Sequence, residues 1–330
     1  MQAVIPIAGF GKRLKPHTHS LPKVLLNVGG KPIIGHILDK LLEEKIYDTT
    51  FIIGYMGEMI VDYVKDNYPD INASYVEQKE LLGLGHAIYT AIPTFNNDEL
   101  FIVLGDTIFD VDLKHVLNAE YSSLGVKEID DPKRFGVAVL ENDKVVKLVE
   151  KPQTPVSKLA LVGLYYVKNS KLLAKCLNEI IEKEIKTKNE YQLTDALQLM
   201  IEKGEVVTTF PVHGWYDCGK PETLLATNKY LLSVESTNRK IESVVINPPV
   251  YIAESALLKN CVVGPYTTIA ENCKIENAVI RNSIINANAV VENIVMEDSL
   301  IGGHAILKGD MKNVNIGDSS EINYSHKLEV

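Results

Sequence analysis

A loop rich in glycine and cationic residues follows the first apolar run of the chain. Ala8 and Gly9 end that run, and Gly11, Lys12 and Arg13 come directly after it. Glycines allow backbone N–H groups to approach an anion closely, and cationic side chains neutralise its charge. These residue types in this order therefore predict a phosphate-binding loop at the end of a buried strand.

Two common phosphate motifs do not fit the loop. The G-x-x-x-x-G-K-[ST] spacing does not occur around Gly9, Gly11 or Gly30, and Leu14 stands where the G-x-G-x-x-G fingerprint needs its third glycine. Two glycines alone are also compatible with a simple tight turn. A binding loop is favoured by the residues that surround them, which are Lys12, Arg13, Pro16, Thr18, Pro22, Lys23, Lys31 and Pro32.

The stretch from residue 9 to residue 32 resembles the signature of the sugar-1-phosphate nucleotidylyltransferases. The family pattern is G-x-G-x-R-L-x-P-x-T, followed by P-K and then K-P. The sequence departs from it at Ala8, where the family often has glycine, and at Lys12, where it often has threonine or serine. The matching positions are Gly9, Gly11, Arg13, Leu14, Pro16, Thr18, Pro22, Lys23, Lys31 and Pro32.

Two acidic residues could hold a divalent cation. Asp106 follows the apolar run 100–104 and a glycine, and Asp217 lies in the segment W-Y-D-C-G. Locally, Asp106 could instead cap a helix and Asp217 could form a turn. Mg²⁺ in nucleotide sites is held by a few carboxylates together with phosphate oxygens. The resemblance implies that Asp106 and Asp217 bind the catalytic Mg²⁺.

The segment from residue 77 to residue 87 contains candidates for base recognition. Gln78 follows an expected strand, and its amide can pair with the edge of a base. The resemblance implies that Gln78 and Gly83 contact a pyrimidine, while His86 is interpreted as a structural histidine at a helix start. The rest of the nucleotide is then assigned to the first loop, at Ala8, Gly9, Gly11 and Lys12.

A second group of residues resembles the sugar side of the family's site. Glu150 and Lys151 lie in an E-K-P segment after an expected strand, and Gly136, Gly163 and Tyr165 lie in strand-like pieces nearby. The resemblance implies that all five bind the sugar phosphate, with Lys151 at the phosphate and Glu150 at the hydroxyls. Residues 189–195 also resemble a segment near the sugar, although a helix start would explain them too.

The implied reaction needs no covalent protein nucleophile. An oxygen of the sugar-1-phosphate attacks the α-phosphorus of a nucleoside triphosphate, and pyrophosphate leaves. Catalysis is then positioning and charge neutralisation. Arg13 would bind the departing phosphates, Lys23 the transferring phosphate and Lys151 the attacking phosphate. The expected small-molecule partners are UTP or dTTP and a sugar-1-phosphate, with glucose-1-phosphate as the expected sugar.

The first two thirds of the chain alternate between short apolar runs and amphipathic segments. Strands are expected at 4–7, 49–53, 74–77, 100–104 and 206–211, and helices at 33–45, 57–67, 86–91, 171–183, 193–203 and 222–234. Such alternation predicts an α/β fold with a mostly parallel, Rossmann-like sheet, whose ligands bind at the carboxyl ends of the strands. Strand-like pieces at 135–140, 145–149 and 161–167 predict an antiparallel extension.

The last part of the chain follows a different pattern. Branched apolar residues recur every six positions, at Val263, Ile269 and Ile275, at Ile285 and Val291, and at Val295, Ile301 and Leu307. This period resembles the hexapeptide repeat of a short left-handed parallel β-helix, with a plain β-meander as the alternative. The predicted domains are a nucleotidyltransferase domain at 1–235 and a β-helix domain at 241–330. Because repeat coils leave end surfaces to be covered, we expect a homo-oligomer.

The composition excludes several classes of protein. The net charge is −9, and no run of Lys and Arg provides a local exception, which argues against a nucleic-acid partner. The sequence contains no long apolar span, so no membrane segment is expected. Its four cysteines lie far apart and fit reduced thiols. A cytoplasmic enzyme is expected.

Three other functions remain open. A bifunctional enzyme would add acyl transfer in the repeats, where His304 is the histidine available. A non-catalytic regulatory paralogue is disfavoured because the loop arginine and the lysine after proline are both present. A glycosyltransferase would use a D-x-D motif, and residues 110–112 form one, but it lies beyond Asp106 and such enzymes lack the first loop.

Overall fold

A computed structural model of the chain describes residues 1–154, 156–236 and 239–310. Strand β1 (Gln2–Pro6) lies inside a nine-stranded sheet whose main order is β10-β9-β11-β6-β1-β4-β5. It pairs in parallel with β4 (Asp48–Ile53) and β6 (Leu100–Val103), and β5 (Asn72–Glu77) extends the parallel part. A parallel strand between two others is covered on both faces, which explains its apolar run.

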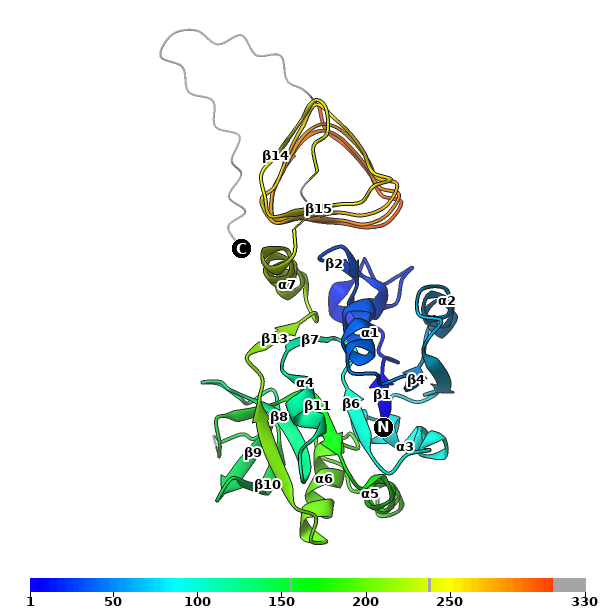
Figure 1. The fold of residues 1–330 in the computed structure, drawn as a ribbon, viewed down its shortest axis with the longest axis vertical. Helices are drawn as coiled ribbons and strands as arrows, with labels where there is room; N and C mark the ends of the chain where they lie inside the picture. The colour runs from blue at the N-terminus through cyan, green and yellow to red at the C-terminus, as the bar shows by residue number, and fades with distance from the viewer. Residues whose placement is uncertain (155, 237–238, 311–330) are drawn as a thin grey trace.

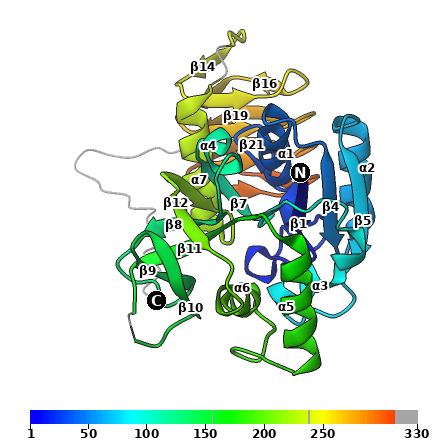
Figure 2. The same ribbon diagram turned by 60° about the horizontal axis from the view of Figure 1, so that its bottom comes forward.

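Helices cover both faces of this sheet (Figures 1 and 2). Side chains alternate between the faces along a strand, so Ala3 and Ile5 enter one core cluster while Val4 enters the other. The first cluster includes residues of α1 (Ile33–Glu43), α2 (Gly57–Asn67) and α4 (Leu113–Leu117). The second includes residues of α3 (Leu84–Thr90), α5 (Ser170–Glu182) and α6 (Leu193–Glu202).

The predicted antiparallel extension is present beside the parallel part. Strand β11 (Leu159–Val167) runs antiparallel to β6 and to β8 (Ser122–Glu128), and β9 (Gly136–Glu141) forms a hairpin with β10 (Lys144–Glu150). Strand β12 (Val207–Pro211) pairs with β8. The sequence did not predict β8, or the ribbon of β7 (Thr107–Asp110) and β13 (Gly214–Asp217), because these short strands mix polar and apolar residues without a clear period.

Helix α7 (Pro221–Val234) leads from the sheet to a parallel β-helix of triangular cross-section (Figure 1). One face contains β15 (Val250–Ile252), β18 (Thr267–Ile269), β20 (Ile284–Ile285) and β22 (Leu300–Ile301). The other two faces share a second sheet, which contains β14 (Val244–Ile246), β16 (Leu257–Lys259), β17 (Cys261–Val263), β19 (Lys274–Ile280), β21 (Val290–Met296) and β23 (Ile306–Lys308). The fold class predicted from the sequence is therefore confirmed.

One part of the predicted repeat register is wrong. Val263, Ile269 and Ile275 point into the β-helix as expected, but Val295 is 79% exposed. Met296 takes the inward position, because it stacks on Ile280 in the coil below. Asn277 and Asn293 have positive φ and form the corners within β19 and β21. The spacing between inward-facing residues is therefore not always six when the chain passes a corner.

The face that contains β15 packs against the first part of the chain. The ring of Tyr251 covers Gly30, and the side chain of Leu231 covers Gly29, in the turn between β2 (Asn27–Val28) and β3 (Lys31–Pro32). Ile284 belongs to the same apolar cluster as Leu14 of the first loop. The β-helix therefore shares a core with the first loop.

Two expectations from composition concern the same described residues. All four cysteines are free and buried. Within those residues, no helix combines the length and the hydrophobicity that a membrane span requires. Residues 311–330 of the expected second domain lie outside the described part of the chain.

A pair of glycine substitutions tests the packing of the β-helix on the turn. Gly30 and Gly204 both have positive φ (99° and 94°), but a Cβ at Gly30 would lie 2.5 Å from the Tyr251 ring, whereas nothing lies within 4 Å at Gly204. We expect Gly204→Ala to cost about 1 kcal/mol through backbone strain alone. Gly30→Ala should cost roughly 1–3 kcal/mol more, because the ring must move. Equal losses in urea unfolding would show that the ring does not press on this turn.

Candidate functional site

The first loop is held in shape by its own residues. Gly11 has φ +59°, a left-handed conformation that starts the short helical turn Lys12–Leu14. The Thr18 hydroxyl donates to the Gly11 carbonyl at 3.0 Å. Leu14 is buried beneath the loop, while Lys12 and Arg13 are exposed. The loop therefore presents its two cations outward from an anchored base, as a site for anions requires.

An ion pair joins the end of this loop to the end of β6. Lys23 begins the short helical turn Lys23–Leu25, and its ammonium group lies 2.6 Å from Oδ2 of Asp106. The Lys23 side chain is 11% exposed, whereas that of Asp106 is 39% exposed. The Lys23 side chain is therefore largely shielded from solvent, while the Asp106 carboxylate remains partly accessible to it.

The second acid lies at the same place. Burial raises the pKa of the Asp217 carboxyl, the charge of Asp106 raises it further, and the charges of Lys23 and Arg13 lower it. A Cβ on Gly219 would lie 2.7 Å from Oδ1 of Asp217 and 2.8 Å from Nη2 of Arg13. The five residues that come together here are thus drawn from four separate segments of the chain, and any side chain at position 219 would separate two of them.

The pair of carboxylates fits a magnesium ion that is shared with a phosphate. Two like charges in proximity destabilise each other unless a cation lies between them. The residues described by the structure contain no group of three or more His, Cys, Asp or Glu side chains suited to a metal. Mg²⁺ is commonly held by one or two carboxylates, with water and phosphate completing its shell. Asp106 and Asp217 match that donor set.

The residues expected at the base lie at the end of β5. Gln78 is buried, and its amide nitrogen lies 3.4 Å from the Gly83 carbonyl and 3.2 Å from Nδ1 of His86. Gly83 has φ +116°, and a Cβ there would lie 2.5 Å from the Tyr191 carbonyl. Gln78 and Gly83 therefore lie side by side, and His86 holds the Gln78 amide, which agrees with its interpretation as a structural residue.

The residues expected at the sugar form a second group across β9, β10 and α6. The Thr194 hydroxyl donates to Oε2 of Glu150 at 2.7 Å, and both groups press on Gly136, where a Cβ would lie 2.9 Å from the Glu150 oxygen. Lys151 follows with φ +44°, and its ammonium lies 3.6 Å from Oε1 of Glu150. The sequence left residues 189–195 open between a segment near the sugar and a helix start, and the position of Thr194 beside Glu150 required the tertiary structure.

Two of the expected sugar residues lie deeper. Tyr165 is 4% exposed, and burial, followed by the nearby charge of Glu150, raises the pKa of its hydroxyl. Gly163 has φ +86°, lies against the Leu104 side chain, and accepts a hydrogen bond from the Leu104 N–H at 2.9 Å. Gly163 therefore fixes the end of β6, two residues before Asp106.

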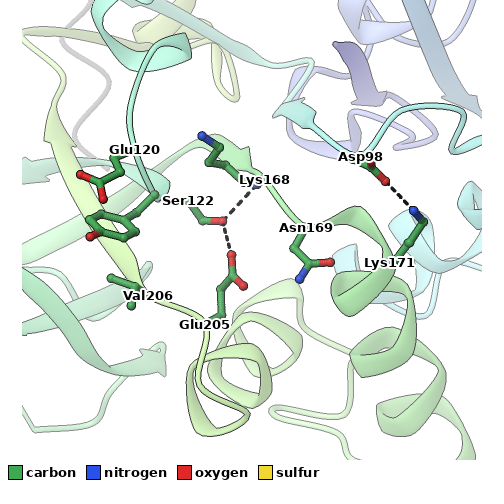
Figure 3. Close-up of a pocket in the computed structure, with 9 residues that line it drawn as sticks. Asp98, Glu120, Ser122, Lys168, Asn169, Lys171, Glu205 and Val206 are labelled. Atoms are coloured by element: carbon green, nitrogen blue, oxygen red, sulfur yellow. Dashed lines mark hydrogen bonds and ion pairs between the residues drawn. The ribbon is translucent and has the colours of Figure 1, made fainter.

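A pocket at the opposite edge of the sheet is not part of this group (Figure 3). It lies where β6, β8 and β12 begin, whereas ligands of parallel sheets bind where strands end. Four of its polar side chains are already paired: the Ser122 hydroxyl donates to Glu205 at 2.8 Å, and Lys171 pairs with Asp98 at 2.8 Å. We assign no function to it.

Comparisons with known proteins show the family of the chain. Residues 2–234 match the family model described as nucleotidyl transferase. The chain is 37% identical to the bifunctional protein GlmU of Methanocaldococcus jannaschii, over 87% of this chain and 74% of that protein. It is 30% identical to the UTP–glucose-1-phosphate uridylyltransferase AglF of Haloferax volcanii, over 67% of this chain and 93% of that protein.

Solved structures share the fold of the first part. A putative glucose-1-phosphate thymidylyltransferase from Bacillus anthracis, in complex with a sucrose, is 30% identical, with a TM-score of 0.61 over 73% of this chain and 98% of its own. A UDP-glucose pyrophosphorylase complexed with UDP-glucose has a TM-score of 0.62 at 24% identity, over 71% of this chain.

The raised pKa of Asp217 predicts a stability change with a defined pH dependence. The folded protein disfavours the ionised carboxyl, so ionisation lowers the free energy of unfolding. This cost is absent below about pH 3.9, the ordinary pKa of aspartate, and it grows as the pH rises through the higher pKa of the folded state. Asp217→Asn should therefore raise the Tm of the metal-free protein at pH 7, and raise it less at acid pH.

Thermal melts in chelator, at acid and neutral pH, measure this effect. Asp62→Asn is the matched control, because Asp62 is exposed on α2. Mg²⁺ should raise the Tm of the wild type and not that of Asp217→Asn. A gain in Tm that is the same at both pH values would contradict the assignment.

Proposed function

The chain belongs to the nucleotidyl transferase family and is a sugar-1-phosphate nucleotidyltransferase, and we propose that it transfers a nucleotidyl group from UTP or dTTP to glucose-1-phosphate with release of pyrophosphate. The observation that supports this most is the convergence of Arg13, Lys23, Asp106 and Asp217 at one edge of the sheet. An exposed arginine, a fixed lysine and two carboxylates are the groups that a metal-bound triphosphate needs.

The triphosphate binds to the first loop in this proposal. Ala8, Gly9, Gly11 and Lys12 contribute backbone groups and one charge, and Arg13 contacts the two phosphates that leave. A planar guanidinium binds two phosphate oxygens at once, which suits a group that must stabilise departing pyrophosphate. The exposed position of Arg13 above buried Leu14 supports this role.

Lys23 neutralises the transferring phosphate. Its ammonium is held by Asp106 and its side chain is only 11% exposed, so little reorganisation is needed when negative charge develops nearby. Mg²⁺ bound by Asp106 and Asp217 would neutralise the phosphates and orient them for in-line displacement. The two carboxylates thus act on the nucleotide, and one of them also orients Lys23.

The sugar phosphate binds on the side of β9 and β10. Lys151 holds its phosphate, and Glu150, fixed by Thr194, accepts hydrogen bonds from sugar hydroxyls. Gly136 leaves room for the sugar, because any Cβ there would fill the space next to Glu150. Gly163 and Tyr165 support this wall from within. Positioning the attacking oxygen in this way accounts for much of the rate in such reactions.

The base lies at the end of β5. The Gln78 amide nitrogen is held by the Gly83 carbonyl and by His86, so the Gln78 carboxamide oxygen can offer an acceptor, and the adjacent Gly83 N–H a donor, to one edge of a pyrimidine. UTP and dTTP share that edge. AglF, which is named for its use of UTP, supports a pyrimidine nucleotide.

A second activity in the β-helix receives little support from the described residues. GlmU is named as bifunctional, and His304 is the histidine that the repeats offer for acyl transfer. His304 is exposed at a corner of the β-helix, and Asn288, at 3.5 Å, is the side chain that contacts it. A non-catalytic paralogue is disfavoured because the cations and acids of the site converge.

We also propose that copies of the chain associate through the β-helix. Val245, Val262, Val279 and Val295 stack in register on its outer face, and the first and last are 59% and 79% exposed. A continuous apolar ladder on an outer surface favours contact with another surface of the same kind.

A panel of nucleotides and sugar phosphates tests the proposed reaction. With Mg²⁺ and glucose-1-phosphate, the protein should release pyrophosphate from UTP or dTTP at least tenfold faster than from ATP or GTP, a ratio that paired hydrogen bonds to a base edge readily provide. If the protein released pyrophosphate from none of the nucleotides with any common sugar-1-phosphate, the proposal would be falsified.

Two substitutions, Arg13→Ala and Lys151→Ala, test whether the nucleotide and the sugar phosphate bind to separate halves of the site. Arg13→Ala should lower kcat by on the order of 100-fold or more, because it removes charge stabilisation of the leaving group. Lys151→Ala should mainly raise the KM for the sugar phosphate, by roughly tenfold, and leave the KM for the nucleotide nearly unchanged. Lys147→Ala, an exposed lysine on β10, is the matched control. If Lys151→Ala instead raised the KM for the nucleotide, the assignment of Lys151 to the sugar phosphate would be wrong.

A further inference from the structure

Asn228 lies within α7, at the contact between the nucleotidyl transferase part and the β-helix. It is 0% exposed. Its carboxamide oxygen accepts hydrogen bonds from the Gly29 N–H at 2.9 Å and from the Thr268 hydroxyl at 2.6 Å, and its amide nitrogen donates to the Tyr266 carbonyl at 3.1 Å. A fully buried polar side chain is stable only when its groups find partners. Asn228 finds them on both sides of the contact.

The bond to Gly29 leads directly to the site. Gly29 starts the turn between β2 and β3, and the strand before that turn begins next to Leu26. The Leu26 N–H donates to the Lys23 carbonyl at 3.0 Å, and the Ile33 N–H, after the turn, donates to the Leu26 carbonyl at 3.1 Å. This hairpin is therefore bonded through its backbone to the residue that pairs with Asp106.

A separate apolar contact connects the same surfaces. Ile284 of the β-helix belongs to one buried cluster with Leu14 and Cys218, and the partly buried Leu300 packs against this cluster. Leu14 is the next residue after Arg13, and Cys218 is the next after Asp217. The β-helix face thus packs under the two segments that carry the loop arginine and one of the acids.

We propose that Asn228 is a positioning residue through which the β-helix sets the geometry of the nucleotide loop. The β-helix holds Asn228 by way of Thr268, and Asn228 holds the Gly29 turn and, through it, Lys23. The inference rests on the proposed function, because it assigns the β-helix a part in that reaction. Such a role goes beyond the assembly of copies.

A pair of substitutions at Thr268 tests the bond from the β-helix side. Thr268→Val replaces the hydroxyl with a methyl group, which cannot remain 2.6 Å from the Asn228 oxygen, so Asn228 must shift. We expect kcat to fall about tenfold, while the KM for UTP or dTTP changes less than about threefold, because Lys23 acts as charge develops. Thr268→Ser keeps the hydroxyl and should restore kcat.

Thr267→Val is the matched control. Thr267 is the neighbouring residue and is equally buried, but its hydroxyl faces the Pro265 and Ile280 carbonyls within the β-helix at 3.5 Å. Its replacement costs the β-helix a similar side-chain change without touching Asn228. We expect the kcat of this variant to stay within about twofold of wild type. All rates are measured well below Tm and normalised to the folded fraction from circular dichroism.

Asn228→Ala and the double variant with Thr268→Val complete a cycle. Both substitutions break the same connection, so the double variant should be no slower than Asn228→Ala alone. Additive losses, or wild-type kcat in both Thr268→Val and Asn228→Ala, would overturn the inference. If Asn228→Ala does not fold, the comparison of Val and Ser at position 268 decides. An inactive wild type would instead refute the proposed function.

Discussion

The site depends on one ion pair, between Lys23 and Asp106. Lys23 ends the nucleotide loop that begins after β1, and Asp106 follows β6, which is the neighbour of β1 in the sheet. The pair therefore closes the loop back onto the sheet at the edge where ligands bind. It also balances charge, because Asp106 and Asp217 repel each other and Lys23 and Arg13 offset that repulsion. Opposite charges at this distance stabilise the ionised carboxylates against their mutual repulsion.

Holding these charges together lowers the free energy of unfolding, and other parts of the structure must offset this loss. The raised pKa of Asp217 means that the folded protein holds a carboxylate where it is not favoured. Sites that bind metal and phosphate are commonly less stable without their ligands, since groups selected for the ligand repel each other in its absence. Here the apolar clusters on both faces of the sheet, and the cluster shared with the β-helix, supply the compensating burial.

Much of this fold could be predicted from sequence because its signals are local. The strand before the loop, helix α2 and the change to a hexapeptide period all follow from spacing within short windows. The error at Val295 shows where local reasoning ends. A six-residue period predicts which side chains point into the β-helix only while every corner contains the same number of residues. Met296 points inward because it pairs with Ile280 of the neighbouring coil. The pairing of Thr194 with Glu150 likewise depends on residues that are distant in sequence.

The position of the β-helix raises a physical question about the nucleotide loop. The Gly29–Gly30 turn is half-buried and lies beneath Leu231 and Tyr251. Covering a backbone N–H without a partner costs about 1–3 kcal/mol. Asn228 provides that partner, and the same oxygen binds Thr268 of the β-helix. The β-helix covers this turn, so the Gly29 N–H needs a partner within the protein. Asn228 is that partner, and through it the β-helix is connected to the turn and to Lys23.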